Sequence, residues 1–385
     1  MRTKTTYLHS VLFMMTAVLA AGCLDSYPPP KGKGTANTLV VEALIDPASG
    51  TGSVTLTRSV PLASEDRPKA ESRADVTIED ESGFSFKLPE TEPGIYKISS
   101  AALSVDKKYR LNIRTSQNSI YQSDYIVSKR TPPIDTISYA VVKDGLEVRV
   151  SAHDPTGNSQ YYRWRYAETW EYYSSYSSQY RFQSPGVVVD RAFNESIQHC
   201  WKTQLGLSIL MESTTRLKED RVSNFPLLVI PGNSIKLSVK YSLLVRQQAL
   251  TEEAYNYWST LQRITENLGG LYDPLPAELK GNISCITDPS ESVIGFFSGG
   301  SIEEKRVFLK VRDLPGGLLR YNPPVCQIDT IDVADLRGTP TGTLLIGAVY
   351  NEEYTKVIAY TTAESRCIDC RTYGGGVLTK PDFWD

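Results

Sequence analysis

A strict alternation of apolar and polar residues at 234–247 constrains the fold of this chain more than any other pattern. The apolar positions are Ile235, Leu237, Val239, Tyr241, Leu243 and Val245. Successive side chains of a strand point to opposite faces of a sheet, so the run predicts one long strand with a buried face. The composition agrees, because the chain contains 23 Tyr and Tyr favours strands. We therefore expect a mainly β protein.

Short strand patterns follow one another closely in the first third of the chain. They lie at 39–45, 53–58, 75–79, 84–88, 94–98, 109–114 and 119–126. Short strands at a spacing of about 8–12 residues are typical of a β-sandwich of the immunoglobulin or fibronectin-III kind. We predict an N-terminal β-sandwich at 38–128. Pro132 and Pro133 mark its boundary, since proline cannot donate a ladder hydrogen bond.

A second β-sandwich-like domain, in tandem with the first, is predicted for the C-terminal part of the chain, 131–385. It opens with strands at 134–142 and 145–152, joined through the hairpin signal Asp144-Gly145. Later strand patterns at 281–285, 293–298 and 306–311 are expected to return to it. Long loops rich in Pro and Gly are expected at 313–342.

One helix is predicted inside the second domain, at 252–267. Its apolar residues recur at steps of three and four: Ala254, Tyr255, Trp258, Leu261, Ile264 and Leu268. Glu252 and Glu253 favour the positive N-terminal end of a helix, and Gly269-Gly270 provides a stop. The aromatic face of this helix is expected to pack on a β layer.

A segment rich in Tyr and Ser follows the strand pattern at 161–170. We expect a loop from residue 171 to 182, with Tyr172, Tyr173, Tyr176 and Tyr180 as candidate contacts to a partner or ligand. Tyr and Ser are common at adaptable recognition surfaces. The alternative is that these aromatic side chains fill a core and cover a sheet.

The N-terminal 23 residues predict export and lipidation. Arg2 and Lys4 precede a short apolar run, and small residues lead into Cys23. The run is shorter than the roughly 20 residues of a membrane span, so 1–22 is predicted to be a lipoprotein signal peptide that is removed. Lipid on Cys23 would then anchor the chain to a membrane, and residues 23–37, with three prolines, would form an extended tether.

Five further cysteines are candidates for disulfides: Cys200, Cys285, Cys326, Cys367 and Cys370. An exported chain meets an oxidising space, and an odd number leaves one free thiol. We predict that Cys200 pairs with Cys285, and Cys326 with Cys367 or Cys370. The C-terminal CxxC is interpreted as a structural clip, because no second CxxC or close His pair completes a zinc site.

The sequence contains no recognisable catalytic motif. HExxH, GxSxG, GxxxxGK[ST] and GxGxxG are absent, and His153 and His199 are the only histidines after the signal peptide. No enzyme activity, metal or cofactor is therefore predicted, and Asp154 is interpreted as a turn residue. The net charge of −3 does not indicate nucleic-acid binding. Carboxylates are plentiful, so a hydrolase with an acid/base pair stays open as a minor alternative.

Several segments resemble the domain-of-unknown-function 4249 (DUF4249) lipoproteins of Bacteroidetes. They are Leu39-Val40-Val41-Glu42, Tyr241-Ser242-Leu243-Leu244-Val245, Gly281-Asn282-Ile283, Val293-Ile294-Gly295 and the Cys-x-Asp-Cys-Arg ending. The resemblance is expected across essentially the whole chain after Cys23. It assigns no catalytic residue. Asp-Thr-Ile tripeptides at Thr136 and Thr330 also match an O-glycosylation pattern of exported Bacteroidetes proteins.

The resemblance implies an outer-membrane lipoprotein that works beside a TonB-dependent barrel and assists nutrient uptake. We expect the protein at the cell surface; Asp25 alone does not exclude the periplasmic face. The first alternative is a free-standing surface adhesin or glycan binder that uses the Tyr/Ser-rich segment. The second is a hydrolase acting on polysaccharide or peptide.

Overall fold

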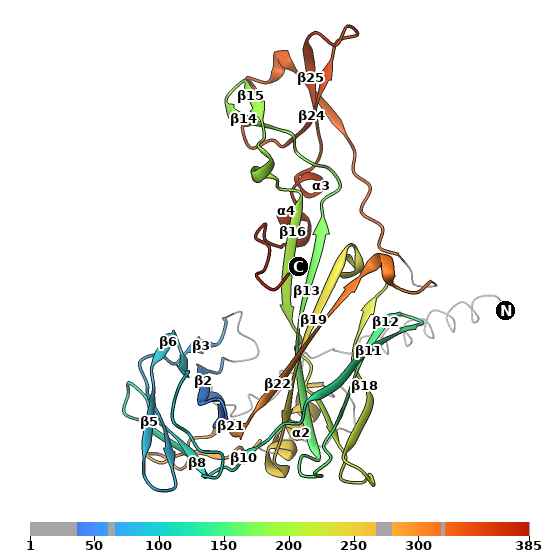
Figure 1. Cartoon of the computed structure of the whole chain (residues 1–385). Helices are drawn as coiled ribbons and strands as arrows, with labels where there is room; N and C mark the ends of the chain where they lie inside the picture. The colour runs from blue at the N-terminus through green and yellow to red at the C-terminus, as the bar shows by residue number, and fades with distance from the viewer. Residues whose placement is uncertain (1–36, 61–65, 267–278, 317–319, 385) are drawn as a thin grey trace, which may run out of the picture.

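The computed structural model describes residues 37–60, 66–266, 279–316 and 320–384. Its sheets form three β bodies along an elongated molecule: two sandwiches side by side and a small distal sheet carried far from the first sandwich (Figure 1). The prediction of a mainly β fold with β-sandwiches in tandem is confirmed. The signal peptide, Cys23 and residues 23–36 of the tether lie outside the described residues.

The first sandwich consists of a seven-stranded and a five-stranded sheet. The strands of the seven-stranded sheet, in spatial order, are β10 (Ser128–Lys129), β21 (Val293–Gly300), β1 (Leu39–Asp46), β2 (Thr51–Arg58), β7 (Ile95–Ile98) and β6 (Glu90–Glu92), with β3 (Lys69–Ala70) on β2. Those of the five-stranded sheet are β20 (Ile283–Cys285), β9 (Ile120–Ser123), β8 (Tyr109–Arg114), β4 (Asp75–Asp80) and β5 (Ser85–Leu88).

Alternation of side chains builds the core of this first sandwich. In β1 the residues Leu39, Val41, Ala43 and Ile45 are buried, whereas Val40 and Glu42 between them are not. Val76 and Ile78 of β4 face them from the other sheet and are fully buried. The period of two read in the sequence therefore matches the faces of the strands.

Two strands of the first sandwich come from late in the chain. β21 pairs in parallel with β1, from Leu39 opposite Val293 to Ile45 opposite Gly299, and β20 pairs with β9. Gly295 permits the close approach, because a Cβ atom there would lie 2.1 Å from the carbonyl oxygen of Val41. The prediction that residues 281–285 and 293–298 return to the second domain is thus wrong: β20 and β21 complete the first sandwich.

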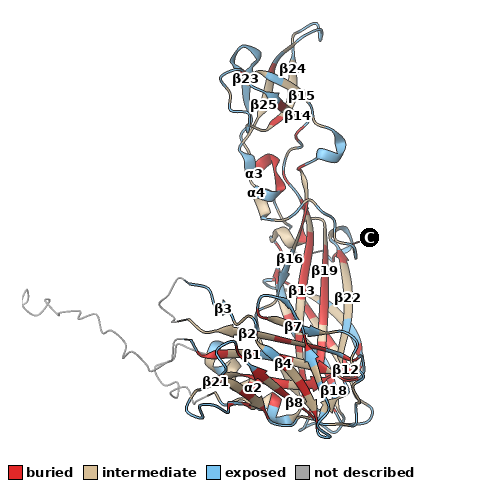
Figure 2. Ribbon diagram, turned by 90° about the vertical axis from the view of Figure 1, so that its left-hand side faces the viewer, coloured by how far each residue is buried: buried red, intermediate tan, exposed pale blue. Residues whose placement is uncertain are grey.

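The second sandwich packs a three-stranded sheet against a five-stranded sheet. The three strands are β11 (Ile134–Val142), β12 (Gly145–His153) and β18 (Arg221–Pro231). The five are β16 (His199–Leu205), β13 (Tyr161–Tyr173), β19 (Lys240–Ala249) and β22 (Ile302–Lys310), with β17 (Leu210–Ser213) on β13. Figure 2 shows the buried residues concentrated along β13 and β19.

The alternating run at 234–247 is a strand only from Lys240. Residues Ile235–Leu237 form the 3-10 helix η2, because the Ser234 side chain accepts a hydrogen bond from the backbone N–H of Lys236 and caps the turn. Leu237 is still buried. From Lys240 the predicted burial holds, with Tyr241, Leu243 and Val245 fully buried. The other 3-10 helices are η1 (Phe193–Glu195), η3 (Val311–Asp313) and η4 (Val333–Asp335).

The predicted helix is confirmed as α2 (Glu252–Glu266), and it lies at the junction of the two sandwiches. Its Tyr257 ring lies 5.3 Å from the Phe296 ring of β21, and its Tyr255 ring lies 4.9 Å from the Tyr161 ring of β13. The helix therefore packs on both sandwiches through its aromatic face.

The third body is a small five-stranded distal sheet. Its strands, in spatial order, are β15 (Val187–Asp190), β14 (Tyr180–Ser184), β24 (Leu345–Tyr350), β25 (Val357–Thr362) and β23 (Asp329–Asp332). Two short helices, α3 (Ser365–Ile368) and α4 (Cys370–Gly374), lie between this sheet and the second sandwich (Figure 1). Parts of the two predicted loop regions, 171–182 and 313–342, thus belong to a separate sheet, in β14 and β23.

Candidate partner-binding surface

The distal sheet carries the candidate functional surface, which we call the tip. The tip comprises residues 180–195 and 325–362. It lies at the opposite end of the molecule from the first sandwich, so it protrudes from the two larger bodies (Figures 1 and 2). This position makes the tip a candidate for contact with a partner.

The core of the tip is small. Only Phe182, Leu336 and Leu345 form its cluster of buried apolar residues, with Tyr180 and Tyr360 partly buried around them. The Tyr180 and Tyr360 rings meet edge to face at 5.2 Å. Such a small core supplies little hydrophobic stabilisation, so the tip depends on other restraints.

Large apolar side chains are exposed on and beside the tip. They are Val187, Phe193, Val325, Ile328, Val333, Tyr350, Tyr354 and Ile358. Phe193 is 98% exposed, Val325 94% and Tyr354 82%. Exposed apolar side chains scattered singly are ordinary, but a concentration of them on one small element marks an interaction surface. These eight side chains therefore make the tip a candidate interaction surface.

Two disulfides hold the base of the tip. Cys326, at the entry to β23, is bonded to Cys367 of α3, and Cys200 of β16 is bonded to Cys370 of α4. We call α3, α4 and these two bonds the clamp. The Cys326–Cys367 bond joins residues 41 apart in sequence, and the Cys200–Cys370 bond joins residues 170 apart. A disulfide that closes such a loop typically contributes about 2–4 kcal/mol to the free energy of unfolding.

The two disulfides of the structure test the predicted cysteine pairings. The pairing of Cys200 with Cys285 is wrong, because Cys285 is buried in the core of the first sandwich and Cys200 in that of the second. Cys326 pairs with Cys367, one of the two predicted alternatives. Cys285 is the free thiol among the described cysteines. The CxxC cysteines bind different partners, so they form a structural clip.

Asp369 orders the clamp between the two CxxC cysteines. Its carboxylate accepts a hydrogen bond from the backbone N–H of Arg371 at 2.9 Å and caps α4. The Arg371 guanidinium also donates to it at 2.6 Å. Burial raises the pKa of Asp369, but the hydrogen bonds from Arg371 outweigh burial and hold this pKa below its usual range.

The four candidate tyrosines do not form one exposed loop. β13 continues to Tyr173, so Tyr172 points into the core, where its hydroxyl donates to the carbonyl oxygen of Cys370 and accepts from the N–H of Gly376. Tyr172 is fully buried, and its prediction as a contact residue is wrong. Of the four, Tyr173 is the most exposed, at 44%.

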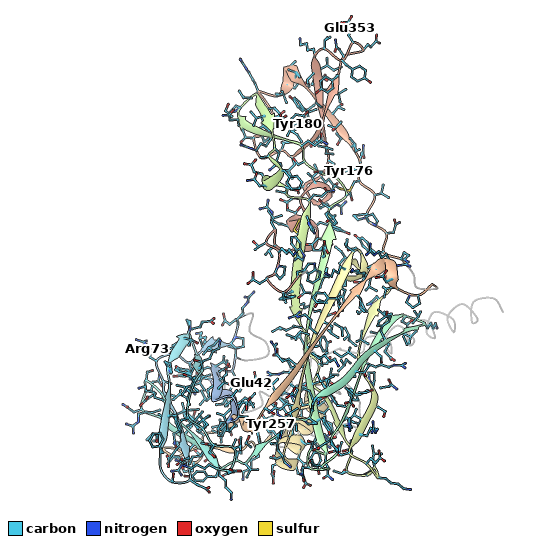
Figure 3. All side chains as sticks on the ribbon, in the orientation of Figure 1. Glu42, Arg73, Tyr176, Tyr180, Tyr257 and Glu353 are labelled. Atoms are coloured by element: carbon cyan, nitrogen blue, oxygen red, sulfur yellow. A yellow bond between two sulfur atoms is a disulfide. The ribbon has the colours of Figure 1, made fainter. Side chains whose placement is uncertain are left out.

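Tyr176 and Tyr180 are structural as well as partly accessible. Tyr176 packs against the clamp near Ile197 and Cys367, and Tyr180 packs on the core of the tip. Figure 3 shows Tyr176 at the level of the clamp and Tyr180 within the distal sheet, with Glu353 at the far end of the tip. The alternative interpretation, in which the tyrosines fill cores, holds for most of this set.

The most exposed apolar residues of the tip were not singled out by any pattern in the sequence. Phe193, Val325 and Tyr354 are isolated apolar residues within polar or Pro-rich stretches. The only available signal was that single large apolar side chains stand where no strand or helix period could bury them. Thr136 and Thr330 are exposed, on β11 and β23, and their glycosylation stays a prediction.

Candidate metal ligands do not cluster in the described part of the chain. No group of three or more His, Cys, Asp or Glu side chains that could hold a metal occurs among the described residues. His153 pairs with Asp135 at 2.8 Å near the surface, and His199 pairs with Glu171 at 2.8 Å. Asp154 accepts hydrogen bonds from Thr156 and Ser159 of its own turn, as predicted for a turn residue.

These features define an elongated protein of β-sandwiches that presents an apolar tip on a disulfide clamp. The comparison with protein families identifies the family of this protein. Residues 25–306 match the family model described as "Domain of unknown function (DUF4249)", and the chain belongs to this family. The match is narrower than the expected resemblance, since β23, β24, β25 and the C-terminal Cys-x-Asp-Cys-Arg lie beyond it.

A solved structure is also similar to part of the chain. It is a segment of two fibronectin type-III domains from chicken tenascin, with 15% sequence identity and a TM-score of 0.16, and the match covers 55% of this chain and 90% of that one. No curated protein matches the sequence. In the described part of the chain, no helix is both long enough and apolar enough to cross a membrane.

Proposed function

We propose that this protein is an outer-membrane lipoprotein, displayed at the cell surface, that binds a TonB-dependent transporter through its tip and assists substrate capture or retention. The observation that carries the proposal is the set of exposed apolar side chains on the tip, beside a core of only three buried apolar residues. The predicted lipidation at Cys23 supports the membrane location. The resemblance to lipoproteins encoded beside such transporters supports the class of partner.

The architecture suits this role. Lipid on Cys23 would hold the N-terminal end at the membrane, and β1, which follows the tether, belongs to the sandwich farthest from the tip. Two sandwiches then separate the anchor from the tip. The two disulfides of the clamp join the base of the tip to neighbouring segments, and such restraint would lower the ordering cost of binding.

A comparison of surface variants tests the proposal. The tagged protein is purified at native expression in mild detergent, with and without the substitutions Phe193→Ser, Val325→Ser and Tyr354→Ser. The wild type should co-purify a TonB-dependent barrel, and the triple variant should lose most of it. The matched control carries Phe84→Ser and Val105→Ser, which remove exposed apolar side chains from the first sandwich.

Two outcomes would contradict the proposal. One is recovery of the wild-type lipoprotein without any barrel. The other is equal loss of the barrel in the triple variant and in the control, because the tip would then have no special role.

A second function, glycan binding, is favoured by one observation. The ring of Tyr173 stacks on His199 at 4.2 Å, and His199 lies 4.0 Å from Trp201. Of these rings Tyr173 is the exposed one, at 44%, and it offers an apolar face beside its polar hydroxyl. Binding to a glycan array that is lost on Tyr173→Ser, in protein free of any barrel, would support this function over the first.

A further inference from the structure

The strand β15 is an open edge of the distal sheet. It lies at one end of the strand order and pairs only with β14 among the described strands, while β23 forms the other end. Figure 1 shows β14 and β15 together on one side of the tip. An edge strand presents backbone N–H and C=O groups with which a further strand can pair.

The register of the β14–β15 hairpin shows which backbone groups face outward. The N–H of Arg191 donates to the carbonyl oxygen of Gln179 at 2.7 Å. Alternate residues of a strand direct their backbone groups to the same side, so Val189 also faces β14. The N–H and C=O groups of Val188 and Asp190 therefore point away from the sheet. In the described part of the chain, no loop backbone group bonds to either residue.

The two edges of the distal sheet differ in their side chains. β23 carries two exposed carboxylates, Asp329 and Asp332, and charged side chains on an edge discourage pairing with another chain. β15 consists of three consecutive valines, at 187–189, and one exposed carboxylate at its end, Asp190. The β15 edge is therefore the less protected of the two.

Another sheet of this protein shows how an open edge is covered. β16 is an edge strand of the second sandwich. Its Trp201 donates its N–H to the carbonyl oxygen of Val377 at 2.9 Å and accepts from the N–H of Val377 at 2.8 Å. An extended segment of the chain thus supplies the backbone groups that this edge needs, and β15 lacks such a segment among the described residues.

Apolar side chains lie beside the β15 edge. Val187 is exposed and shares a face of the strand with Val189. Val189 lies opposite Arg181, whose guanidinium pairs with Glu195 of η1 at 2.9 Å. η1 begins with the exposed Phe193, so an added strand would find apolar contacts as well as backbone partners.

Packing holds the β14–β15 hairpin in place. Its turn contains Gly186 in the left-handed region, with a φ of 80°. A Cβ atom at Gly186 would lie 2.6 Å from Cγ of Arg337, so the turn packs closely on the segment that follows η4. Val188 packs on the core of the tip. A preformed edge lowers the ordering cost of binding.

We propose that β15 binds an extended, apolar segment of the transporter by strand addition. This inference rests on the proposed function, because it names the mode in which the tip binds its partner. In strand addition, backbone hydrogen bonds hold the added segment and side-chain contacts give specificity. Here Val188 and Asp190 supply the backbone groups, and Val187 and Phe193 supply the apolar contacts.

Proline at Val188 separates backbone pairing from side-chain contact. The N–H of Val188 faces outward, so Val188→Pro removes that donor and leaves the hydrogen bonds to β14 intact. The tagged full-length protein is purified in mild detergent at native expression. Val188→Pro should reduce the co-purified barrel about tenfold or more, because an acceptor of the added strand loses its donor. The control Val188→Thr keeps the N–H and the branched shape and should retain the barrel.

Hydrogen exchange provides a second measurement, which needs no variant and decides if Val188→Pro fails to fold. In the purified complex, the β15 peptide should contain two more protected amides than in the isolated lipoprotein, those of Val188 and Asp190. The β23 peptide should exchange equally in both samples, because its edge stays open.

Three results would overturn the inference and leave the proposed function standing. They are equal recovery of the barrel with folded Val188→Pro and wild type, equal loss with Val188→Pro and Val188→Thr, and unchanged exchange of β15 in the complex. Protection of β15 in a lipoprotein dimer free of any barrel would also overturn it, since the added strand would come from a second copy. Absence of the barrel from the wild type would instead contradict the proposed function, and the inference with it.

Discussion

The first sandwich and the tip are both β structures, but they are stabilised in different ways. Eighteen buried apolar residues form the core of the first sandwich, against three in the tip. The first sandwich recruits β20 and β21 from late in the chain to complete its sheets, whereas the tip relies on the clamp and leaves large apolar side chains in solvent.

This difference fits the separate roles that the proposed function gives to the two regions. Under the proposed function, the first sandwich with its larger core serves as a spacer. A small sheet with exposed apolar surface gains stability when a partner covers it, because a ligand that binds the folded state alone stabilises that state. If the two regions differ in this way, changes in the first core and changes in the tip should have separate effects.

The largest expected effect comes from Phe297→Ala in β21. Phe297 is fully buried in the first core, so its truncation should cost about 3–5 kcal/mol. Hydrogen exchange of β8 in the same core should accelerate accordingly, while β12 of the second sandwich is unchanged. Ser298→Ala on the same strand is the control. An unchanged β8 would mean that β21 does not stabilise this sandwich.

Removal of the Cys326–Cys367 bond should have the next largest effect. The double variant Cys326→Ser, Cys367→Ser should lose about 2–4 kcal/mol, confined to the tip. Hydrogen exchange should then rise in β24 and β25 and not in β8. Equal destabilisation of β8 would show that the tip and the first sandwich unfold as one unit.

Acid should loosen the clamp through Asp369. The folded-state pKa of Asp369 is lowered from its ordinary value of 3.8, so its contribution to stability is present above that value. The contribution is lost as the pH falls through the folded pKa. Asp369→Asn should remove this dependence and retain a capping oxygen. The unfolding temperature of both proteins between pH 2 and 6 provides the measurement, and parallel curves would contradict the role of the carboxylate.

The smallest effect on stability is expected at the tip surface. Phe193→Ser, Val325→Ser and Tyr354→Ser each replace an exposed side chain and should change the free energy of unfolding by at most about 0.5 kcal/mol. Urea denaturation of the isolated lipoprotein measures this. A loss of several kcal/mol would mean that these side chains belong to a core and not to a binding surface.

Local periodicity explains which parts of the fold were predictable. The strands of the first sandwich and α2 follow from side-chain alternation and helical spacing, which neighbouring residues determine. The parallel pairing of β1 with β21 joins segments about 250 residues apart, and no local pattern records it. The 3-10 turn at Ile235 depends on a single cap at Ser234, within an otherwise regular period.

The candidate site was less predictable than the fold. The Tyr/Ser-rich segment leads into the tip, but Tyr172 faces inward, because β13 extends three residues beyond the predicted strand. Disulfide connectivity depends on which sheets meet in space, so the spacing of cysteines did not reveal it. Phe193, Val325 and Tyr354, the most exposed of the large apolar residues of the tip, follow no strand or helix period in the sequence.

Photo-crosslinking in cells tests the central claim most directly. A photoreactive amino acid is placed at Tyr354 of the tip or, as a matched control, at Phe84 of the first sandwich, and both side chains are exposed. The account predicts a crosslinked adduct with a TonB-dependent barrel from position 354 and none from position 84. Adducts of equal yield from both positions, or no adduct from position 354 at native expression, would contradict it.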